Sequence, residues 1–170
     1  LPFVTLAIII DSGFPVIYKQ DRLGKGGKPF MLYKFRTMVQ NAEADGKALL
    51  AIENDPRITR VGNFLRKTRL DEFPQFFNVL RGEMSLAGPR AEREELVWKF
   101  QKEIPFYRAR LLVKPGISGW AQISQGYASS IYETGVKLEY DLYYIKHRTI
   151  GMDINILLRT IGTVFGFKGR

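Results

Sequence analysis

Residues 15–36, PVIYKQDRLGKGGKPFMLYKFR, decide the fold class of this chain. Residues 15–20 and 30–36 are rich in β-branched and aromatic side chains, a composition that is typical of short strands. Residues 21–29 lie between them and contain three glycines, which indicates a turn. The segment therefore predicts a basic β-hairpin.

The rest of the chain favours helices. Residues 91–104, 132–145 and 153–165 are predicted to be helical, and in the first and last of these apolar side chains recur at spacings of three and four. Residues 39–50 are also expected to form a helix. We therefore predict an α+β fold that is mostly helical with a small β-hairpin.

Three finer predictions concern positions within this framework. Pro56 is suited to the start of a helix, where its missing N–H has no partner to lose. Residues 115–119 contain one proline and two glycines and are expected to form an irregular loop. In the last helix the apolar residues expected to be buried are Ile154, Leu157, Leu158, Ile161 and Phe165.

The chain opens on an apolar run from Leu1 to Ile10. This run is too short to cross a bilayer, because a spanning helix needs about 20 residues. A buried segment of a soluble core and the second half of a longer hydrophobic element broken at Pro2 are equally compatible with it. Because the first residue is not Met, we expect a fragment whose upstream part is missing.

Composition narrows the chemistry that is open to the chain. It carries 26 Lys and Arg against 17 Asp and Glu, so its net charge of +9 attracts anions such as nucleic acid, acidic lipid or phosphorylated small molecules. It has no Cys and one His, His147, which excludes thiol nucleophiles, disulfides and His-cluster metal sites. An enzyme built from this chain would use carboxylates, Lys, Arg, backbone amides and a hard cation such as Mg²⁺.

The pair Asp71-Glu72 is the strongest candidate for chemistry. Pro74 is tolerated only in the first turn of a helix, which places the two carboxylates at or just before a helix start. Acidic residues there usually complement the helix dipole. Here, however, Arg66 precedes the pair and Arg90 follows it, and a carboxylate among cations can act as a nucleophile without a general base. The pattern suits phosphoryl transfer.

Two further motifs are weak when each is taken alone. Residues 33–38, YKFRTM, place Lys34 and Arg36 on one face of a strand, which an ordinary solvated basic face explains. Residues 84–90, MSLAGPR, place Arg90 after a rigid Gly-Pro turn that can hold its guanidinium toward a phosphate. Asp141 lies in a predicted helix, where it could orient an arginine.

Six segments occur in an order that resembles the bacterial sugar transferase family. Within this family, the chain is most similar to the monotopic polyprenyl-phosphate phosphoglycosyl transferases, and in particular to the catalytic domain of a longer member. The segments that carry the resemblance are residues 16–20, 33–38, 70–80, 84–90, 115–122 and 140–146.

The resemblance implies a reaction and assigns roles to residues. Asp71 would attack the phosphorus bonded to the sugar of a nucleoside diphosphate sugar, with UDP-sugar expected from the family. A covalent phosphosugar–aspartate would then pass to polyprenyl (undecaprenyl) phosphate. Glu72, together with Asp71, would bind Mg²⁺. Lys34, Arg66 and Arg90 match family positions near phosphate.

The resemblance also implies a place for the protein. Residues 1–12 would be the C-terminal half of a broken, re-entrant membrane helix. Residues 13–170 would be a catalytic domain on the cytoplasmic face of the bacterial inner membrane. The reaction would be the first membrane step of exopolysaccharide, O-antigen or capsule assembly. No nucleic-acid partner is expected, and assembly into a homo-oligomer is possible.

Two rival classes explain part of the sequence. A basic nucleic-acid-binding module would use the positive charge, and exposed aromatic rings for stacking. A non-catalytic membrane-surface module would use the charge and the apolar start. Neither gives a role to a carboxylate pair inside a basic cluster.

Overall fold

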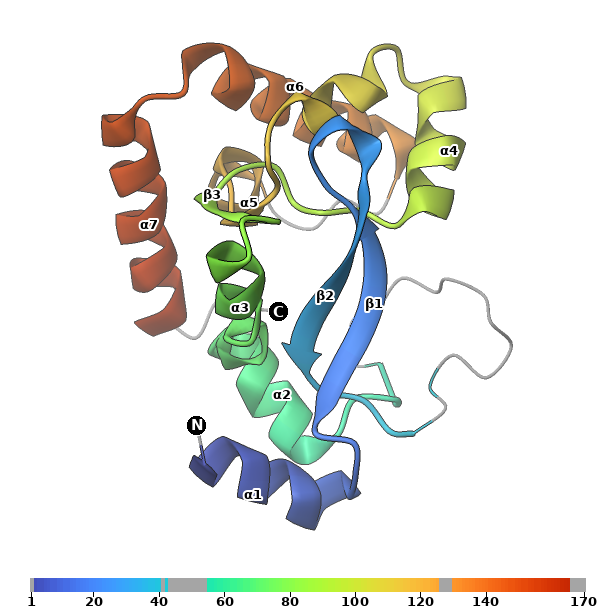
Figure 1. Cartoon of the computed structure of the whole chain (residues 1–170), viewed down its shortest axis with the longest axis vertical. Coiled ribbons are helices and arrows are strands. Elements are labelled where there is room, and N and C mark those ends of the chain that lie inside the picture. The colour runs from blue at the N-terminus through green and yellow to red at the C-terminus, as the bar shows by residue number, and fades with distance from the viewer. Residues whose placement is uncertain (1, 41, 43–54, 126–129, 166–170) are drawn as a thin grey trace. The chain divides into compact units, whose positions relative to one another are not determined.

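The computed structural model describes residues 2–40, 42, 55–125 and 130–165, with side chains described to residue 162 (Figure 1). The chain divides into two compact units. The first comprises residues 1–19, 33–74 and 163–170, and the second comprises residues 20–32 and 75–162. Most of the helix predicted at 39–50 lies outside the described residues.

The described residues form the mostly helical α+β fold that the sequence predicts. Short 3-10 turns occupy Lys25–Gly27, Leu70–Glu72 and Tyr107–Leu112. The helices and strands, in chain order, are α1 (Pro2–Ser12), β1 (Ile17–Leu23), β2 (Pro29–Phe35), α2 (Arg60–Lys67), α3 (Gln75–Leu80), β3 (Ser85–Ala87), α4 (Glu94–Glu103), β4 (Gly116–Ser118), α5 (Trp120–Ser124), α6 (Ile131–His147) and α7 (Ile150–Phe165).

The predicted hairpin is confirmed as β1 paired with β2. Strand β1 continues to Leu23, three residues beyond its expected end at Gln20. The backbone N–H of Leu23 donates to the carbonyl of Glu92 at 3.0 Å, and this long-range contact keeps the chain extended. Nothing in the sequence of the turn indicates that Glu92 is this partner.

The core of the first unit joins α1, the open end of the hairpin and α2. Its buried centre is Ile8, Phe35 and Leu65, around which five partly buried apolar side chains pack. Those five are Val4, Val16, Ile17, Val61 and Leu70. Burying this surface supplies the main favourable free energy of the unit.

Helix α2 does not begin at Pro56, so that prediction is wrong. The Asp55 carboxylate accepts from both the backbone and the guanidinium of Arg57, which holds residues 55–57 in a turn. The helix begins at Arg60, and the Thr59 hydroxyl caps it by accepting from the N–H of Gly62 at 3.0 Å.

In the second unit, residues 116–118 are a strand and not the irregular loop that was expected. Strand β4 pairs in parallel with β3, with Ser85 opposite Gly116 and Ala87 opposite Ser118. A Cβ on Gly116 would lie 2.2 Å from the backbone nitrogen of Gly88. Glycine therefore allows the two segments to approach closely enough to pair.

Helices α6 and α7 occupy the predicted places, but α7 buries a different face from the one expected. Ile156 is fully buried, whereas Ile154, Leu158 and Ile161 are all at least half exposed. The buried face carries Met152 and Ile156, and also Thr160, whose hydroxyl contacts that of Ser118 at 2.6 Å. Leu157 is partly buried, and the side chain of Phe165 lies outside the described residues.

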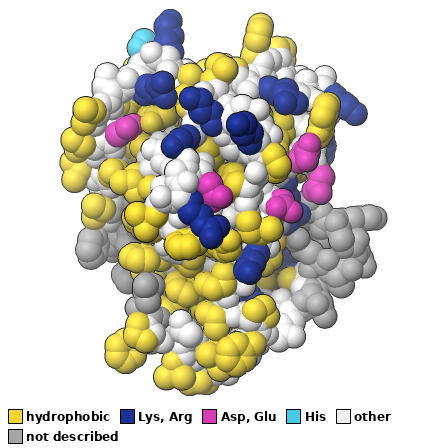
Figure 2. Space-filling view, in the orientation of Figure 1, with side chains coloured by type: hydrophobic (Ala, Val, Ile, Leu, Met, Phe, Trp, Pro, Cys, Tyr) yellow, Lys and Arg dark blue, Asp and Glu magenta, His cyan; other side chains and the backbone are white. Residues whose placement is uncertain are grey.

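Helix α1 carries the apolar N-terminal run. Its side chains Phe3, Leu6 and Ile10 are exposed, as is Phe14 just beyond it. Figure 2 shows hydrophobic side chains gathered at the lower end of the view, where Figure 1 places α1. Among the described residues, no helix combines the length and the apolar character that crossing a membrane requires.

Candidate active site

Asp71 and Glu72 lie on a sharp turn between α2 and α3. The Thr68 hydroxyl donates to the carbonyl of Phe64 and closes the last turn of α2. Arg69 then adopts a left-handed conformation with φ 54°, which is uncommon outside glycine and reverses the chain into the 3-10 turn of the dyad. Both carboxylate residues are 7% exposed, so the dyad is buried.

Glu72 forms an ion pair with Lys34. The Lys34 ammonium donates to the Glu72 carboxylate at 2.9 Å, and both side chains are largely buried. Lys34 comes from β2 and Glu72 from the turn before α3, two segments that are far apart in sequence. The structure thus brings together two of the residues predicted for the site, both in the first unit.

Arg66 is fixed by the segment that follows β2. Its Nε donates to the Thr37 hydroxyl at 2.9 Å, and the backbone N–H of Thr59 donates to the Thr37 carbonyl at 3.1 Å. The close approach depends on Gly62, because a Cβ there would lie 2.1 Å from the Thr37 carbonyl oxygen. The hydrogen bond to Thr37 therefore holds the guanidinium of Arg66 in place.

The solvated basic face considered for residues 33–38 is wrong. Arg36 is 7% exposed and donates through Nη2 to the carbonyl of Ser12 at 2.7 Å and to the Ser12 hydroxyl at 2.9 Å. Nη2 also reaches the carbonyl of Gly13. A cation at these carbonyls stabilises the C-terminus of α1. Arg36 therefore anchors the apolar helix, a role that the sequence did not reveal.

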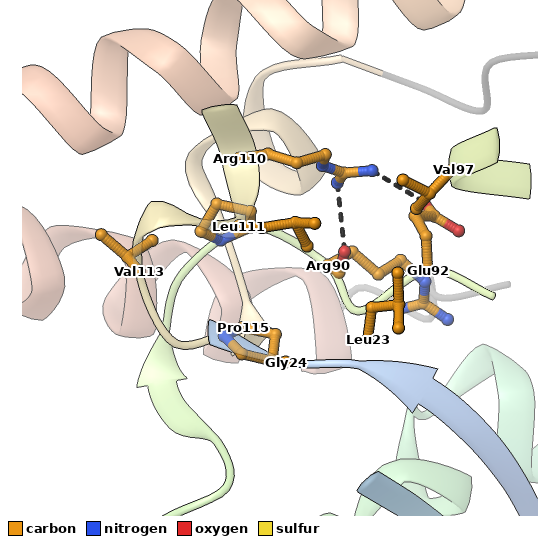
Figure 3. Close-up of a pocket in the computed structure, with 10 residues that line it drawn as sticks. Leu23, Gly24, Arg90, Glu92, Val97, Arg110, Leu111, Val113 and Pro115 are labelled. Carbon is orange, nitrogen blue, oxygen red and sulfur yellow. Dashed lines mark hydrogen bonds and ion pairs between the residues drawn. The ribbon is translucent and has the colours of Figure 1, made fainter. Parts of the chain in front are cut away.

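Arg90 lies in the second unit, in a segment whose backbone is extensively hydrogen-bonded. Figure 3 shows the Arg110 guanidinium directed at the backbone carbonyl of Arg90 and at the Glu92 carboxylate. Arg110 also forms an ion pair with Asp141 at 2.8 Å, with both side chains 2% exposed. The prediction that Asp141 orients an arginine is confirmed, but Arg110 itself was missed.

Glu92 forms ion pairs with three cationic side chains. The sequence did not indicate this residue. Its carboxylate lies 3.0 Å from Lys137, 3.4 Å from Arg110 and 3.7 Å from Arg22. Burial by itself raises the pKa of this carboxyl, but the three cations outweigh burial and lower the pKa to about 2. Burial also raises the pKa of the neighbouring Tyr107 to about 12.

The cavity beside Arg90 and Arg110 is small (Figure 3). Its volume is about 10 Å³, which is room for no more than one water molecule. Its lining is mostly apolar, and the charged groups on it are Arg90, Glu92 and Arg110 of the network.

The structure thus places Lys34, Arg66, Asp71 and Glu72 in the first unit and Arg90 in the second. The sequence pattern of the bacterial sugar transferase family matches residues 1–167 of the chain.

The chain belongs to this family.

Three relatives show what this bacterial sugar transferase is similar to. It is 51% identical over 164 residues to the UDP-N-acetylgalactosamine-undecaprenyl-phosphate N-acetylgalactosaminephosphotransferase of Aeromonas hydrophila, covering 96% of this chain and 38% of that protein. It is 43% identical over 168 residues to the UDP-glucose:undecaprenyl-phosphate glucose-1-phosphate transferase of Escherichia coli, covering 98% and 35%. The undecaprenyl-phosphate galactose phosphotransferase of Salmonella typhimurium is 42% identical over 175 residues, with coverages of 95% and 36%. The chain therefore spans little more than a third of each of these relatives.

The dyad of this sugar transferase has donors that suit Mg²⁺. Magnesium is commonly held by one or two carboxylates together with phosphate oxygens of a substrate. Asp71 and Glu72 supply adjacent buried carboxylates, and the described residues contain no cluster of three or more His, Cys, Asp or Glu side chains arranged for a metal. The two carboxylates of the dyad are therefore chemically suited to a divalent cation.

Proposed function

We propose that this bacterial sugar transferase is a phosphoglycosyl transferase. It moves a sugar 1-phosphate from a UDP-sugar to undecaprenyl phosphate, the first membrane step in assembling an exopolysaccharide, O-antigen or capsule. The observation that supports it most directly is the buried Asp71-Glu72 dyad, with Lys34 paired to Glu72 at 2.9 Å. The relatives named above carry undecaprenyl phosphate and a sugar phosphate in their names, which agrees with this substrate class.

Asp71 is the proposed nucleophile. A carboxylate oxygen of Asp71 forms a bond to the phosphorus that carries the sugar, while the bond from that phosphorus to the bridging oxygen breaks. Uridine monophosphate leaves with the electron pair of the broken bond. An oxygen of undecaprenyl phosphate then attacks the same phosphorus, and the Asp71 carboxylate is released. The product is undecaprenyl diphosphate sugar, and no oxidant, reductant or water is consumed.

Glu72 and Lys34 keep the charge around Asp71 balanced. In this proposal Glu72, with Asp71, holds Mg²⁺, which when bound neutralises charge on the diphosphate. The Lys34 ammonium contacts Glu72 directly, so it fixes the carboxylate that receives the metal. Arg66 and Arg90 are the further phosphate-binding residues that the family resemblance implies. Their forked guanidinium groups match phosphate oxygens in pairs.

Helix α1 is the proposed membrane contact, on the cytoplasmic face of the inner membrane. The exposed side chains of Phe3 and Ile10 would insert into the interface, and the net charge of +9 would favour anionic lipid. Flotation with vesicles containing anionic lipid tests this. Phe3→Ser with Ile10→Ser should weaken binding, whereas Phe106→Ser, at an equally exposed phenylalanine, should not; equal binding by all three proteins would contradict the assignment.

Intact-protein mass spectrometry tests the proposed reaction. The protein is mixed with Mg²⁺ and each member of a panel of UDP-sugars, without undecaprenyl phosphate. We expect a mass increase equal to the sugar 1-phosphate minus one water, and release of uridine monophosphate. The adduct should disappear in Asp71→Asn and persist in the control Asp21→Asn, which changes an exposed aspartate of β1.

Two outcomes would overturn the proposal. One is the absence of an adduct and of nucleotide release with every sugar in the panel. The other is an adduct that survives in Asp71→Asn. Tight, salt-dependent binding of nucleic acid together with the first outcome would favour the nucleic-acid-binding class instead.

A further inference from the structure

The segment that carries Arg90 is held by its own backbone carbonyls. Between residues 87 and 92, five carbonyl oxygens accept hydrogen bonds from outside the segment. The donors, in order along the segment, are the Tyr144 hydroxyl, the Gly116 N–H, the Arg110 guanidinium, the Arg22 guanidinium and the Leu23 N–H. So many external donors on one short segment leave its backbone little freedom.

Arg110 is the donor to the carbonyl of Arg90 itself. Its Nη2 lies 3.1 Å from that carbonyl oxygen and 2.8 Å from the Asp141 carboxylate. Its Nη1 donates to the Tyr107 hydroxyl at 2.8 Å. A single guanidinium therefore ties the backbone of residue 90 to α6, through Asp141, and to the turn Tyr107–Leu112.

The buried contacts of Arg110 contribute little net stability. Arg110 and Asp141 are each nearly fully buried, and removing two charges from water opposes folding unless the geometry is nearly ideal. A buried pair of this kind gives more in defined geometry than in stability. Lysine could not replace Arg110, because one ammonium cannot span the carbonyl, the carboxylate and the hydroxyl at once.

We propose that Arg110 is a positioning residue that sets the direction of the Arg90 side chain through the Arg90 carbonyl. This inference rests on the proposed function, in which Arg90 binds a phosphate. Arg110 touches no substrate in this proposal. It acts only through Arg90, and Asp141 and Tyr107 act by holding Arg110.

A double-mutant cycle on the detergent-solubilised protein tests the proposal. The four forms are wild type, Arg110→Lys, Arg90→Ala and the double variant. Each is assayed, with undecaprenyl phosphate present as acceptor, for uridine monophosphate release from the UDP-sugar used best by the wild type. Arg110→Lys should lower kcat/KM by about 10-fold or more, the loss of one charge-assisted contact. In the Arg90→Ala background the same change should have almost no further effect. Arg110→Lys should also alter the same constant, kcat or KM, that Arg90→Ala alters.

A purely structural role predicts a different pattern. The losses from Arg110→Lys and Arg90→Ala would multiply, and Arg110→Lys would lower kcat through a smaller folded fraction with KM unchanged. Tyr107→Phe provides the milder variant in case Arg110→Lys does not fold, because it keeps the ring and removes only the hydroxyl that Arg110 contacts. Arg108→Lys, at an exposed neighbour, is the matched control and should leave kcat/KM near the wild-type value.

The possible results either support the positioning role of Arg110 or overturn it. Non-multiplying losses with Arg110→Lys, or with Tyr107→Phe in its place, support the proposal. Multiplying losses overturn it while leaving the transferase reaction intact. Full activity in Arg90→Ala overturns both the phosphate-binding role of Arg90 and the positioning role of Arg110. A wild-type protein that releases no nucleotide from any UDP-sugar overturns the proposed function, and this inference with it.

Discussion

The ammonium of Lys34 and the carboxylate of Glu72 form a buried ion pair with a separation of 2.9 Å. Removing one partner of such a pair leaves an uncompensated charge, so Lys34→Met should lower the free energy of unfolding by roughly 3 kcal/mol. The double variant Lys34→Met with Glu72→Gln should recover most of that stability and none of the activity. Urea unfolding and nucleotide release, measured on the same samples, would show this separation; a double variant as unstable as Lys34→Met would count against it.

Glu72→Gln should weaken the use of metal, and it should also lower stability because it leaves the Lys34 ammonium without its charged partner. The amide keeps the size of the side chain but loses the charge that attracts a divalent cation. We expect lower activity and a higher Mg²⁺ concentration for half-maximal rate. A Mg²⁺ titration of nucleotide release checks this, with Glu103→Gln as a surface control. An unchanged titration curve would remove Glu72 from the proposed metal site.

Arg90→Lys should not behave as a conservative change. Lysine keeps the charge but cannot form the two parallel contacts of a guanidinium. Loss of one charge-assisted hydrogen bond predicts a decrease in kcat/KM of about 10- to 100-fold. Steady-state kinetics measure this directly, and wild-type turnover in Arg90→Lys would rule out a forked contact.

Gly62→Ala should destabilise the first unit. The added Cβ would lie 2.1 Å from the Thr37 carbonyl oxygen, so α2 would have to move away from the segment that fixes Arg66. Overpacking of this kind lowers stability by about 1 to 3 kcal/mol. Thermal unfolding would show the loss, and activity should fall with it.

Gly135→Ala is the matched control for that change. Gly135 lies within α6, and a Cβ there would meet nothing within 4 Å. Alanine is the better helix former by about 1 kcal/mol, so this variant should be as stable as the wild type or more so. A loss of stability in Gly135→Ala equal to that in Gly62→Ala would show that the clash with Thr37 is not the cause.

Glu92 should make the free energy of unfolding decrease as the pH becomes acidic. Its pKa is lowered from 4.5 to about 2 in the folded protein, so it contributes stability above pH 4.5 that is lost as the pH falls toward 2. At neutral pH this contribution is about 3 kcal/mol. Glu92→Gln should therefore be less stable at neutral pH, and the difference from wild type should shrink on acidification. Denaturant unfolding across that range would measure it, and a difference that is constant with pH would contradict the assignment.

The sequence was sufficient for features that depend on neighbours along the chain. The aromatic content of residues 30–36 predicted β2, and the apolar spacing of residues 91–104 predicted α4, whose Val97 is buried. The placing of Asp71 and Glu72 just before a helix start also followed from local rules, because Pro74 is restricted to the first turn.

Features that depend on distant partners could not be predicted in this way. Nothing near Arg110 in the sequence shows that it reaches the carbonyl of Arg90 and the carboxylate of Asp141. The apolar pattern of α7 is compatible with more than one buried face. The burial of Ile156 and the contact between Thr160 and Ser118 show which face packs. Strand β4 likewise exists because β3 lies beside it.

The pairing of β3 with β4 has a consequence for protein engineering. A Cβ on Gly88 would lie 2.6 Å from the Lys114 carbonyl oxygen, and one on Gly119 would lie 2.2 Å from the Gly88 carbonyl oxygen. The backbones of residues 84–90 and 115–122 therefore approach each other so closely that neither can change without the other. Chimeras between family members will need to exchange residues 84–90 and 115–122 together, since a change in the backbone of either segment alone would disturb this close approach.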